Sequence, residues 1–211
     1  MSYSFGINLC GAPQIDESAF IGRESELASI CERLVPKEGI STQRVLVLSG
    51  LGGMGKTQLS IEFAKRYREL FDTIYWMNAK SETLLRASFI GLAERVLQLG
   101  QVIGIGPEEE DKIVRQMRDW LSKVGNNRWL LIFDNYDDPQ VKGIRNATAF
   151  DIRKYFPYVS QGSILITTRY PRLSFGKIIR LNKFEDVQEG LAVLIQRSGR
   201  TGIKKGNISL F

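Results

Sequence analysis

The sequence predicts an α/β fold in which a mainly parallel sheet lies between two layers of helices. Five short apolar segments, rich in β-branched residues, are typical of strands buried on both faces; they cover residues 44–49, 73–77, 128–135, 162–169 and 177–181. Segments with helical periodicity alternate with them, which indicates parallel strands joined by crossover helices. A glycine-rich loop, "SGLGGMGKTQLS" at residues 49–60, follows the first of these strands.

Each helical segment places apolar side chains on one face. These faces are Leu27, Ile30, Cys31 and Leu34 in residues 22–35; Leu59, Phe63, Tyr67 and Leu70 after the loop; Leu85, Phe89, Leu92, Ala93 and Val96 in residues 82–99; Ile113, Met117, Trp120, Leu121 and Val124 in residues 107–124; and Val187, Leu191, Leu194 and Ile195 in residues 185–199. Pro107 and the four acids after it suit the first turn of a helix, which explains that acidic cluster without a metal.

Composition excludes several classes of protein. With 43% hydrophobic and 25% charged residues, the chain is expected to be globular rather than disordered. No apolar run reaches the roughly 18 residues of a membrane span, and no signal peptide is visible. Two cysteines cannot form a disulfide framework, so a cytoplasmic location is expected. The chain has no histidine, which excludes His-dependent triads and most zinc sites.

The net charge of +6 does not predict a nucleic-acid partner. Residues 197–205, "RSGRTGIKK", carry four positive charges and no negative one. The other residues therefore carry a net charge of only +2, from 6 − 4. A basic segment at a chain terminus is usually solvated, so nucleic-acid binding is not expected.

The loop from Gly50 to Thr57 fits the G-x-x-x-x-G-K-[ST] pattern between a strand and a helix. Lys56 supplies a positive charge toward the β and γ phosphates, and the Thr57 hydroxyl can ligate Mg²⁺. The helix that follows adds the positive end of its dipole, and Gln58 is expected to contact the nucleotide as well. Phosphate oxygens can be approached by backbone N–H groups that no bulky side chain blocks, those of Gly52, Gly53, Met54 and Gly55.

Two later strands end in polar side chains that complete a phosphate site. Asp134 ends "WLLIFD" and is expected to hold Mg²⁺, directly or through water. Thr168 and Arg169 end "LITTR" and could face the γ-phosphate, where an arginine can distinguish a triphosphate from a diphosphate. Taken without this context, an arginine at a strand end is as likely to pair with a surface acid. Lys56, Asp134 and Arg169 are thus the candidates for any catalysis.

Five motifs in this order resemble the NB-ARC domain of NOD-like receptors, a branch of the STAND P-loop NTPases, in a fungal style. They are "FIGRESEL" (20–27), "GLGGMGKT" (50–57), "IYWMNA" (74–79), "WLLIFDN" (129–135) and "ILITTR" (164–169). The resemblance implies a three-layer fold with strand order 5-1-4-3-2 and a switch between an ADP-bound resting form and an ATP-bound assembling form. It also implies that Arg169 senses the γ-phosphate, and that the adenine and ribose lie near Phe20, Ile21, Gly22 and Arg23.

One departure from the family pattern concerns hydrolysis. Hydrolytic relatives carry an acid directly after the metal-binding aspartate, whereas this chain has Asn135, which cannot act as a base. Asp137 and Asp138 are the nearby acids that could orient water, with Asp137 the first candidate. ATP hydrolysis is therefore expected to be slow or absent.

Residues 1–18 are expected to be an irregular lead-in, 19–199 the nucleotide-binding domain, and 200–211 a basic, flexible tail. The chain ends soon after this module, without the closing subdomains of the family. The first interpretation is a regulatory module that binds ATP and ADP and assembles with like modules. A truncated module that pairs with full-length relatives and a small-molecule phosphotransferase are the alternatives; DNA binding ranks last.

Overall fold

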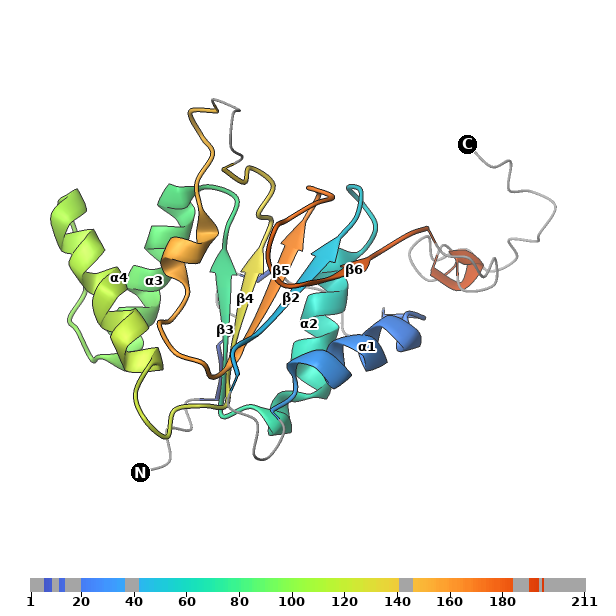
Figure 1. Ribbon diagram of the computed structural model, residues 1–211, viewed down its shortest axis with the longest axis horizontal. Coiled ribbons are helices and arrows are strands. Elements are labelled where there is room, and N and C mark those ends of the chain that lie inside the picture. The colour runs from blue at the N-terminus through green and yellow to red at the C-terminus, as the bar shows by residue number, and fades with distance from the viewer. Residues whose placement is uncertain are drawn as a thin grey trace.

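The computed structural model describes residues 6–8, 12–13, 20–36, 42–140, 146–183, 190–193 and 195. Within them, six strands form one parallel sheet in the order β1-β3-β4-β5-β2-β6 (Figure 1). The strands are β1 (Gly6–Asn8), β2 (Arg44–Ser49), β3 (Thr73–Asn78), β4 (Trp129–Asp134), β5 (Ser163–Thr168) and β6 (Lys177–Arg180).

The five expected strands are all present, and from β6 to β3 they have the order 5-1-4-3-2 that the family resemblance implies. The sixth, β1, pairs in parallel with the edge of β3. The expectation that residues 1–18 are irregular is therefore wrong at Gly6–Asn8. A three-residue edge strand is held by backbone hydrogen bonds, which need no hydrophobic pattern that a sequence could display.

Helices cover both faces of the sheet. On one face lie α1 (Glu24–Leu34) and α2 (Lys56–Arg66); on the other lies α3 (Glu82–Val96), against which α4 (Pro107–Leu121) packs (Figure 1). Consecutive residues of β2 point to opposite faces: Leu46 and Leu48 join the core under α1 and α2, and Val47 joins the core under α3. Because both faces are covered, the strands are apolar throughout, which is why the sequence shows continuous runs.

Three helices end earlier than their apolar patterns predict. The helix after the glycine loop ends at Arg66, and Leu70 lies 37% exposed in a short 3₁₀ turn, η2 (Arg68–Leu70). The helix expected over 82–99 ends at Val96. The helix expected to run to residue 124 ends at Leu121, leaving Val124 98% exposed. An apolar residue at helical spacing does not extend a helix once the chain turns away from the core.

Several expectations lie outside the described residues. The domain boundaries at 18/19 and 199/200 and the tail at 200–211 fall there, as does most of the closing helix at 185–199, of which residues 190–193 and 195 are described and helical. No helix in the described ranges is long and apolar enough to cross a membrane.

Candidate functional site

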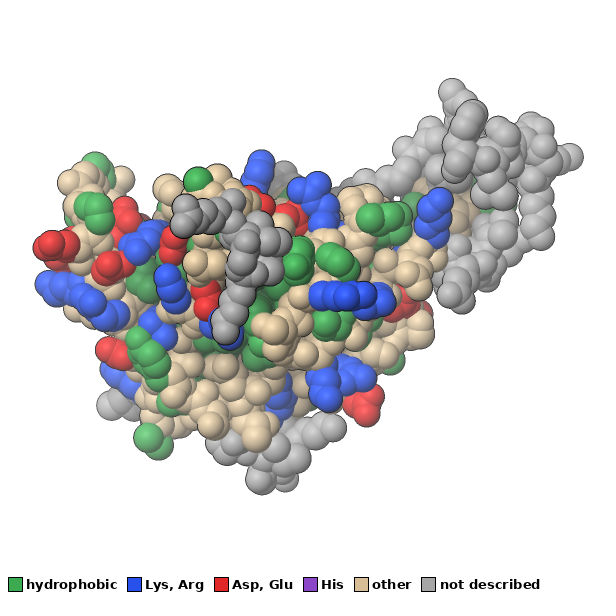
Figure 2. Space-filling view, turned by 45° about the horizontal axis from the view of Figure 1, so that its top comes forward, with side chains coloured by type: hydrophobic (Ala, Val, Ile, Leu, Met, Phe, Trp, Pro, Cys, Tyr) green, Lys and Arg blue, Asp and Glu red, His purple; other side chains and the backbone are tan. Residues whose placement is uncertain are grey.

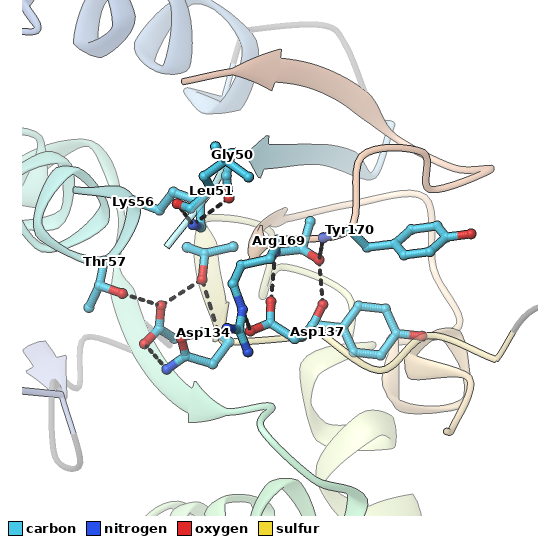
Figure 3. A network of polar contacts seen from close by, with 12 residues as sticks. Gly50, Leu51, Lys56, Thr57, Asp134, Asp137, Arg169 and Tyr170 are labelled. Carbon is cyan, nitrogen blue, oxygen red and sulfur yellow. Dashed lines mark hydrogen bonds and ion pairs between the residues drawn. The ribbon is translucent and has the colours of Figure 1, made fainter. Parts of the chain in front are cut away.

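The candidate site lies at the edge of the sheet where the parallel strands end. The glycine loop follows β2, Asp134 is the last residue of β4, and Arg169 comes directly after β5. Because β5 lies between β2 and β4, the three segments meet although they are far apart in sequence (Figure 3). The geometry therefore joins the residues that sequence reasoning selected from three separate motifs.

The glycine loop is shaped by left-handed backbone and by one close approach. Gly53 and Gly55 have φ values of 78° and 84°, which favour glycine, and α2 begins immediately afterwards at Lys56. At Gly50 an added Cβ would lie 2.7 Å from the carbonyl oxygen of Leu181, whereas at Gly52 it would lie 4.0 Å from the Cδ of Arg169. Gly50 is thus required for packing, and Gly52 faces the open side of the loop.

Lys56 folds back over the loop that precedes it. Its Nζ donates to the carbonyl oxygens of Gly50 at 2.7 Å and Leu51 at 2.9 Å, and the side chain is only 9% exposed (Figure 3). Burial lowers the pKa of this ammonium, while the nearby carboxylates of Asp137 and Asp134 oppose that shift. The loop therefore holds a partly desolvated cation, which strengthens its attraction for an anion.

Asp134 is a buried carboxylate whose two oxygens accept three hydrogen bonds. Thr57 and Thr167 donate to Oδ1 at 2.9 and 2.6 Å, and the amide of Asn135 donates to Oδ2 at 2.9 Å. Burial raises the pKa of Asp134, and the two threonine hydroxyls oppose that shift. Since Asp134 is only 2% exposed, its link to the open site is the half-buried Thr57, which lines the cavity described below.

After β4 the chain turns sharply and presents a second carboxylate. Asn135 adopts a left-handed conformation with φ 66°, and the Asp137 N–H donates to the Asn135 carbonyl at 2.9 Å. Both oxygens of Asp137 are engaged by one residue: Arg169 donates its backbone N–H to Oδ1 and its Nε to Oδ2, each at 2.6 Å (Figure 3). The expected γ-phosphate sensor is therefore ion-paired in this structure.

Two adjoining cavities open at this edge. The loop cavity, of about 850 Å³, is lined by the glycine loop, Lys56, Thr57, Gln58, Lys80, residues 135, 137 and 138, and residues 169–171. The strand-end cavity, of about 820 Å³, is lined by Leu51, Met54, Leu181, Asn182 and four cations, which are Arg169, Arg172, Arg180 and Lys183. Figure 2, which turns this edge toward the viewer, shows Lys and Arg side chains spread over this face, several of them right of centre. Arg169 and Pro171 line both cavities.

Most of the predicted loop residues line one of the two cavities. Gly52, Gly53, Gly55, Lys56, Thr57 and Gln58 line the loop cavity, and Met54 lines the strand-end cavity. Phe20, Ile21, Gly22 and Arg23 line neither cavity. Arg23 reaches the site only indirectly, because its Nη2 donates to the carbonyl of Asn182 at 2.6 Å.

Thr168, which was expected to face the γ-phosphate, lines neither cavity. Its side chain is fully buried, donates to the Tyr136 carbonyl and accepts from the Tyr170 N–H. Thr167, which sequence reasoning missed, instead contacts Asp134 and accepts from the Asn135 N–H at 2.9 Å. The sequence offered one signal for Thr167: neighbouring residues of a strand face opposite sides of the sheet, so only one residue of the Thr167–Thr168 pair could share the side of Asp134.

The oxygen ligands fit a hard divalent cation that the protein would hold only in part. The described residues contain no group of three or more His, Cys, Asp or Glu side chains that could form a metal cage. Thr57 and Asp134 supply one hydroxyl and one carboxylate, 2.9 Å apart. Mg²⁺ is typically held by one or two such groups together with substrate phosphates and water. Gly53 leaves open space within 4 Å of its missing Cβ, so the backbone there can be approached closely.

Comparisons with known proteins agree with this geometry. The model of the NB-ARC domain family matches residues 23–179. A nucleotide-binding leucine-rich repeat (NLR)-like protein of Hyaloscypha variabilis is 31% identical over 160 residues, a match covering 72% of this chain and 16% of that relative. Cdc6p from Pyrobaculum aerophilum has a similar structure, with a TM-score of 0.55 at 13% identity over 91% of this chain and 52% of the other. This chain thus spans a small part of the NLR-like relative and about half of Cdc6p, and the likeness to Cdc6p shows the fold alone.

Proposed function

Because the chain belongs to the NB-ARC family, we propose that it binds ATP and ADP as the regulatory module of a NOD-like-receptor signalling switch. One observation supports this above all others. The glycine loop, Lys56, Thr57 and Arg169 line a single cavity, with the Asp134 carboxylate directly behind Thr57. A module of this kind recognises phosphates by position and charge rather than by covalent chemistry.

The loop cavity would take the phosphates. Lys56 would exchange its two carbonyl contacts for phosphate oxygens, and the N–H groups at the start of α2 point toward an anion in that position. Thr57 and Asp134 would hold Mg²⁺, which supplies positive charge that bridges and neutralises the β and γ phosphates. Arg169 would contact a third phosphate, and its side chain, which passes Gly52 and lines the same cavity, supports this role.

The strand-end cavity is our candidate for the base and ribose. Leu51, Met54, Pro171 and Leu181 give it an apolar lining, which suits a purine ring, and it adjoins the loop cavity at Arg169. The four residues from Phe20 to Arg23 would then support this cavity from behind, through the bond between Arg23 and Asn182. The preference for adenine over guanine is part of the proposal.

Hydrolysis is proposed to be slow or absent. The amide of Asn135 donates to Asp134 and has no basic group with which to accept a proton. Asp137 lines the cavity, but both of its oxygens are occupied by Arg169. A site with no unengaged base at the water position would retain ATP rather than turn it over.

Family membership supports three further proposals. They are homotypic assembly with other NB-ARC modules, a cytoplasmic location, and a role in innate immune signalling. Each concerns the larger protein in which such a module works, and none changes the chemistry proposed for the site.

Lys56→Ala tests the proposal directly. Loss of a charge-assisted contact to phosphate costs about 1.5–3 kcal/mol, so affinity for ADP should fall by about 10- to 150-fold. Isothermal titration with ADP, ATP and GDP measures this, and the nucleotide released from purified protein on denaturation gives an independent reading. Lys112→Ala on the remote helix α4, where the lysine is exposed and paired with Glu109, is the control. If Lys56→Ala binds ADP as tightly as the wild type, the proposed function is wrong.

A further inference from the structure

Asp137 and Arg169 form a two-point contact at the mouth of the loop cavity. The backbone N–H of Arg169 and its Nε donate to different oxygens of the same carboxylate, each at 2.6 Å. The Arg169 side chain is 64% exposed and that of Asp137 is 22% exposed. The guanidinium is therefore free to leave on its outer side, while the carboxylate is held more firmly.

The carboxylate would remain in place if the guanidinium moved away. Asp137 is fixed by the Arg169 backbone N–H and by its own N–H bond to the Asn135 carbonyl at 2.9 Å, and neither depends on the Arg169 side chain. Movement of the arginine toward a phosphate would thus leave an unpaired negative charge in the same cavity. A carboxylate and a phosphate in one partly desolvated cavity repel each other.

The charges of the cavity are balanced before any ligand enters. Lys56, Lys80 and Arg169 contribute three positive charges, and Asp134, Asp137 and Asp138 contribute three negative ones. Asp134 is engaged by Thr57, Thr167 and Asn135 and is shielded by burial, whereas Asp137 lines the cavity itself. Of these two carboxylates, Asp137 is the one that competes directly with a nucleotide for a cation.

We propose that Asp137 is a positioning residue that lowers the ratio of triphosphate to diphosphate affinity of the site. This inference rests on the proposed nucleotide-binding function. A diphosphate bound at Lys56 and Thr57 leaves the Asp137–Arg169 pair intact. A third phosphate gains Arg169 only by breaking that pair, so the pair lowers triphosphate affinity selectively and favours the diphosphate form of the module.

This role differs from that of a water-orienting acid. A general base must be available to accept a proton from water, whereas Asp137 has its two oxygens committed to Arg169. The two roles predict different results for Asp137→Asn. Loss of a base would slow hydrolysis and leave nucleotide affinity unchanged, whereas loss of the counter-ion would change affinity in the absence of any turnover.

The first experiment compares affinities for ADP and for β,γ-imido-ATP, which the protein cannot hydrolyse at the β,γ position, in wild type and Asp137→Asn. Asparagine keeps the shape of the side chain and an acceptor for the Arg169 N–H but removes the charge. The ratio of triphosphate to diphosphate affinity should rise about three- to tenfold, as expected for releasing one partly exposed ion pair and one repulsive charge. Arg169→Ala should lower the same ratio.

Asp151→Asn is a matched control. Asp151 also accepts from both the backbone N–H and the guanidinium of one arginine, Arg153, and the exposed fractions of 23% and 56% resemble those of the Asp137 pair. Asp151 does not line either cavity. Its substitution should leave the affinity ratio unchanged.

The second experiment follows the Arg169 Nε–H by NMR, with the resonance assigned by its absence in Arg169→Ala. The signal should have nearly the same chemical shift in free and ADP-bound wild type, and should move when β,γ-imido-ATP binds. In Asp137→Asn it should already differ in the free protein. A merely structural effect of the substitution would not produce this ligand-dependent pattern.

The outcomes separate this inference from the function on which it rests. If wild type binds ADP in a Lys56-dependent way but Asp137→Asn leaves the ratio unchanged or lower, the role of Asp137 is refuted and nucleotide binding stands. If Asp137→Asn slows hydrolysis while leaving both affinities unchanged, Asp137 is the water-orienting acid instead. If wild type binds neither nucleotide, both proposals fall together.

Discussion

Replacing Gly50 by alanine should destabilise the protein, whereas replacing Gly52 should leave its stability intact and weaken nucleotide binding. At Gly50 an added Cβ would lie 2.7 Å from the backbone oxygen of Leu181. Leu181 cannot easily yield, because its N–H donates to the carbonyl of Ser49 at 2.7 Å. Overpacking of this kind costs about 1–3 kcal/mol, and alanine returns about 0.4–1 kcal/mol by restricting the unfolded chain.

The net loss for Gly50→Ala is therefore about 1–2 kcal/mol, or a fall in Tm of about 2–8 °C for a chain of this size. Gly52 has no positive φ, and the only atom within 4.0 Å of its added Cβ is in the Arg169 side chain. Gly52→Ala should therefore match or slightly exceed wild-type stability. Its methyl group would project over the open side of the loop and weaken ADP binding.

Urea unfolding of the nucleotide-free variants measures the first effect, and titration with ADP measures the second. Each variant serves as the control for the other, because both make the same chemical change in the same loop. The reasoning is refuted if Gly50→Ala is as stable as wild type, or if Gly52→Ala is the less stable of the two.

Two further predictions concern stability. Gly162→Ala would place a Cβ 2.2 Å from the buried Trp129 ring at φ 75°, and should lower the unfolding free energy by about 3 kcal/mol or more. Gly125 has a φ of 85° but open space around it, so Gly125→Ala should cost only about 1–2 kcal/mol. Equal losses of the two variants in urea unfolding would contradict the packing argument. Burial raises the pKa of Asp134, so the folded protein binds a proton at this carboxylate more readily than the unfolded chain does. As the pH falls from the raised pKa toward the ordinary pKa of an aspartate, the stability of wild type should therefore increase relative to Asp134→Asn. A stability difference between the two proteins that is flat or shrinks from pH 7 to 4 would contradict this prediction.

The fold could be predicted from the sequence because both faces of its strands are covered. That burial produces continuous apolar runs, which are visible in the chain without any knowledge of neighbours. The strand order came from the family resemblance, since periodicity fixes the faces of a strand but not its position in the sheet. The edge strand Gly6–Asn8 could not be foreseen, because its place depends on backbone pairing with β3.

The site was predictable where local sequence determines it. The loop from Gly50 to Thr57 carries its own glycines, and Asp134 ends a strand whose apolar residues mark it clearly. The choice between Thr167 and Thr168 was not determined in this way, because a strand that is buried on both faces has no polar alternation to show which residue faces the site. Only the register of β5 against β2 and the hydrogen bonds to Asp134 decide for Thr167.

The contact between Asp137 and Arg169 depends on structure 32 residues away in the chain and on one unusual backbone conformation. Asn135 adopts the left-handed turn that asparagine tolerates well and thereby directs Asp137 toward Arg169. An acid at the exposed position 135 would place a second carboxylate beside Asp134 Oδ2, where the amide now donates at 2.9 Å, and the two negative charges would repel each other. Asn135 stands where hydrolytic relatives carry an acid. It also donates a hydrogen bond to the buried Asp134, and its turn positions Asp137, the counter-ion of Arg169. Both effects fit the proposed function, in which the site holds a nucleotide and discriminates its phosphates with slow or absent hydrolysis.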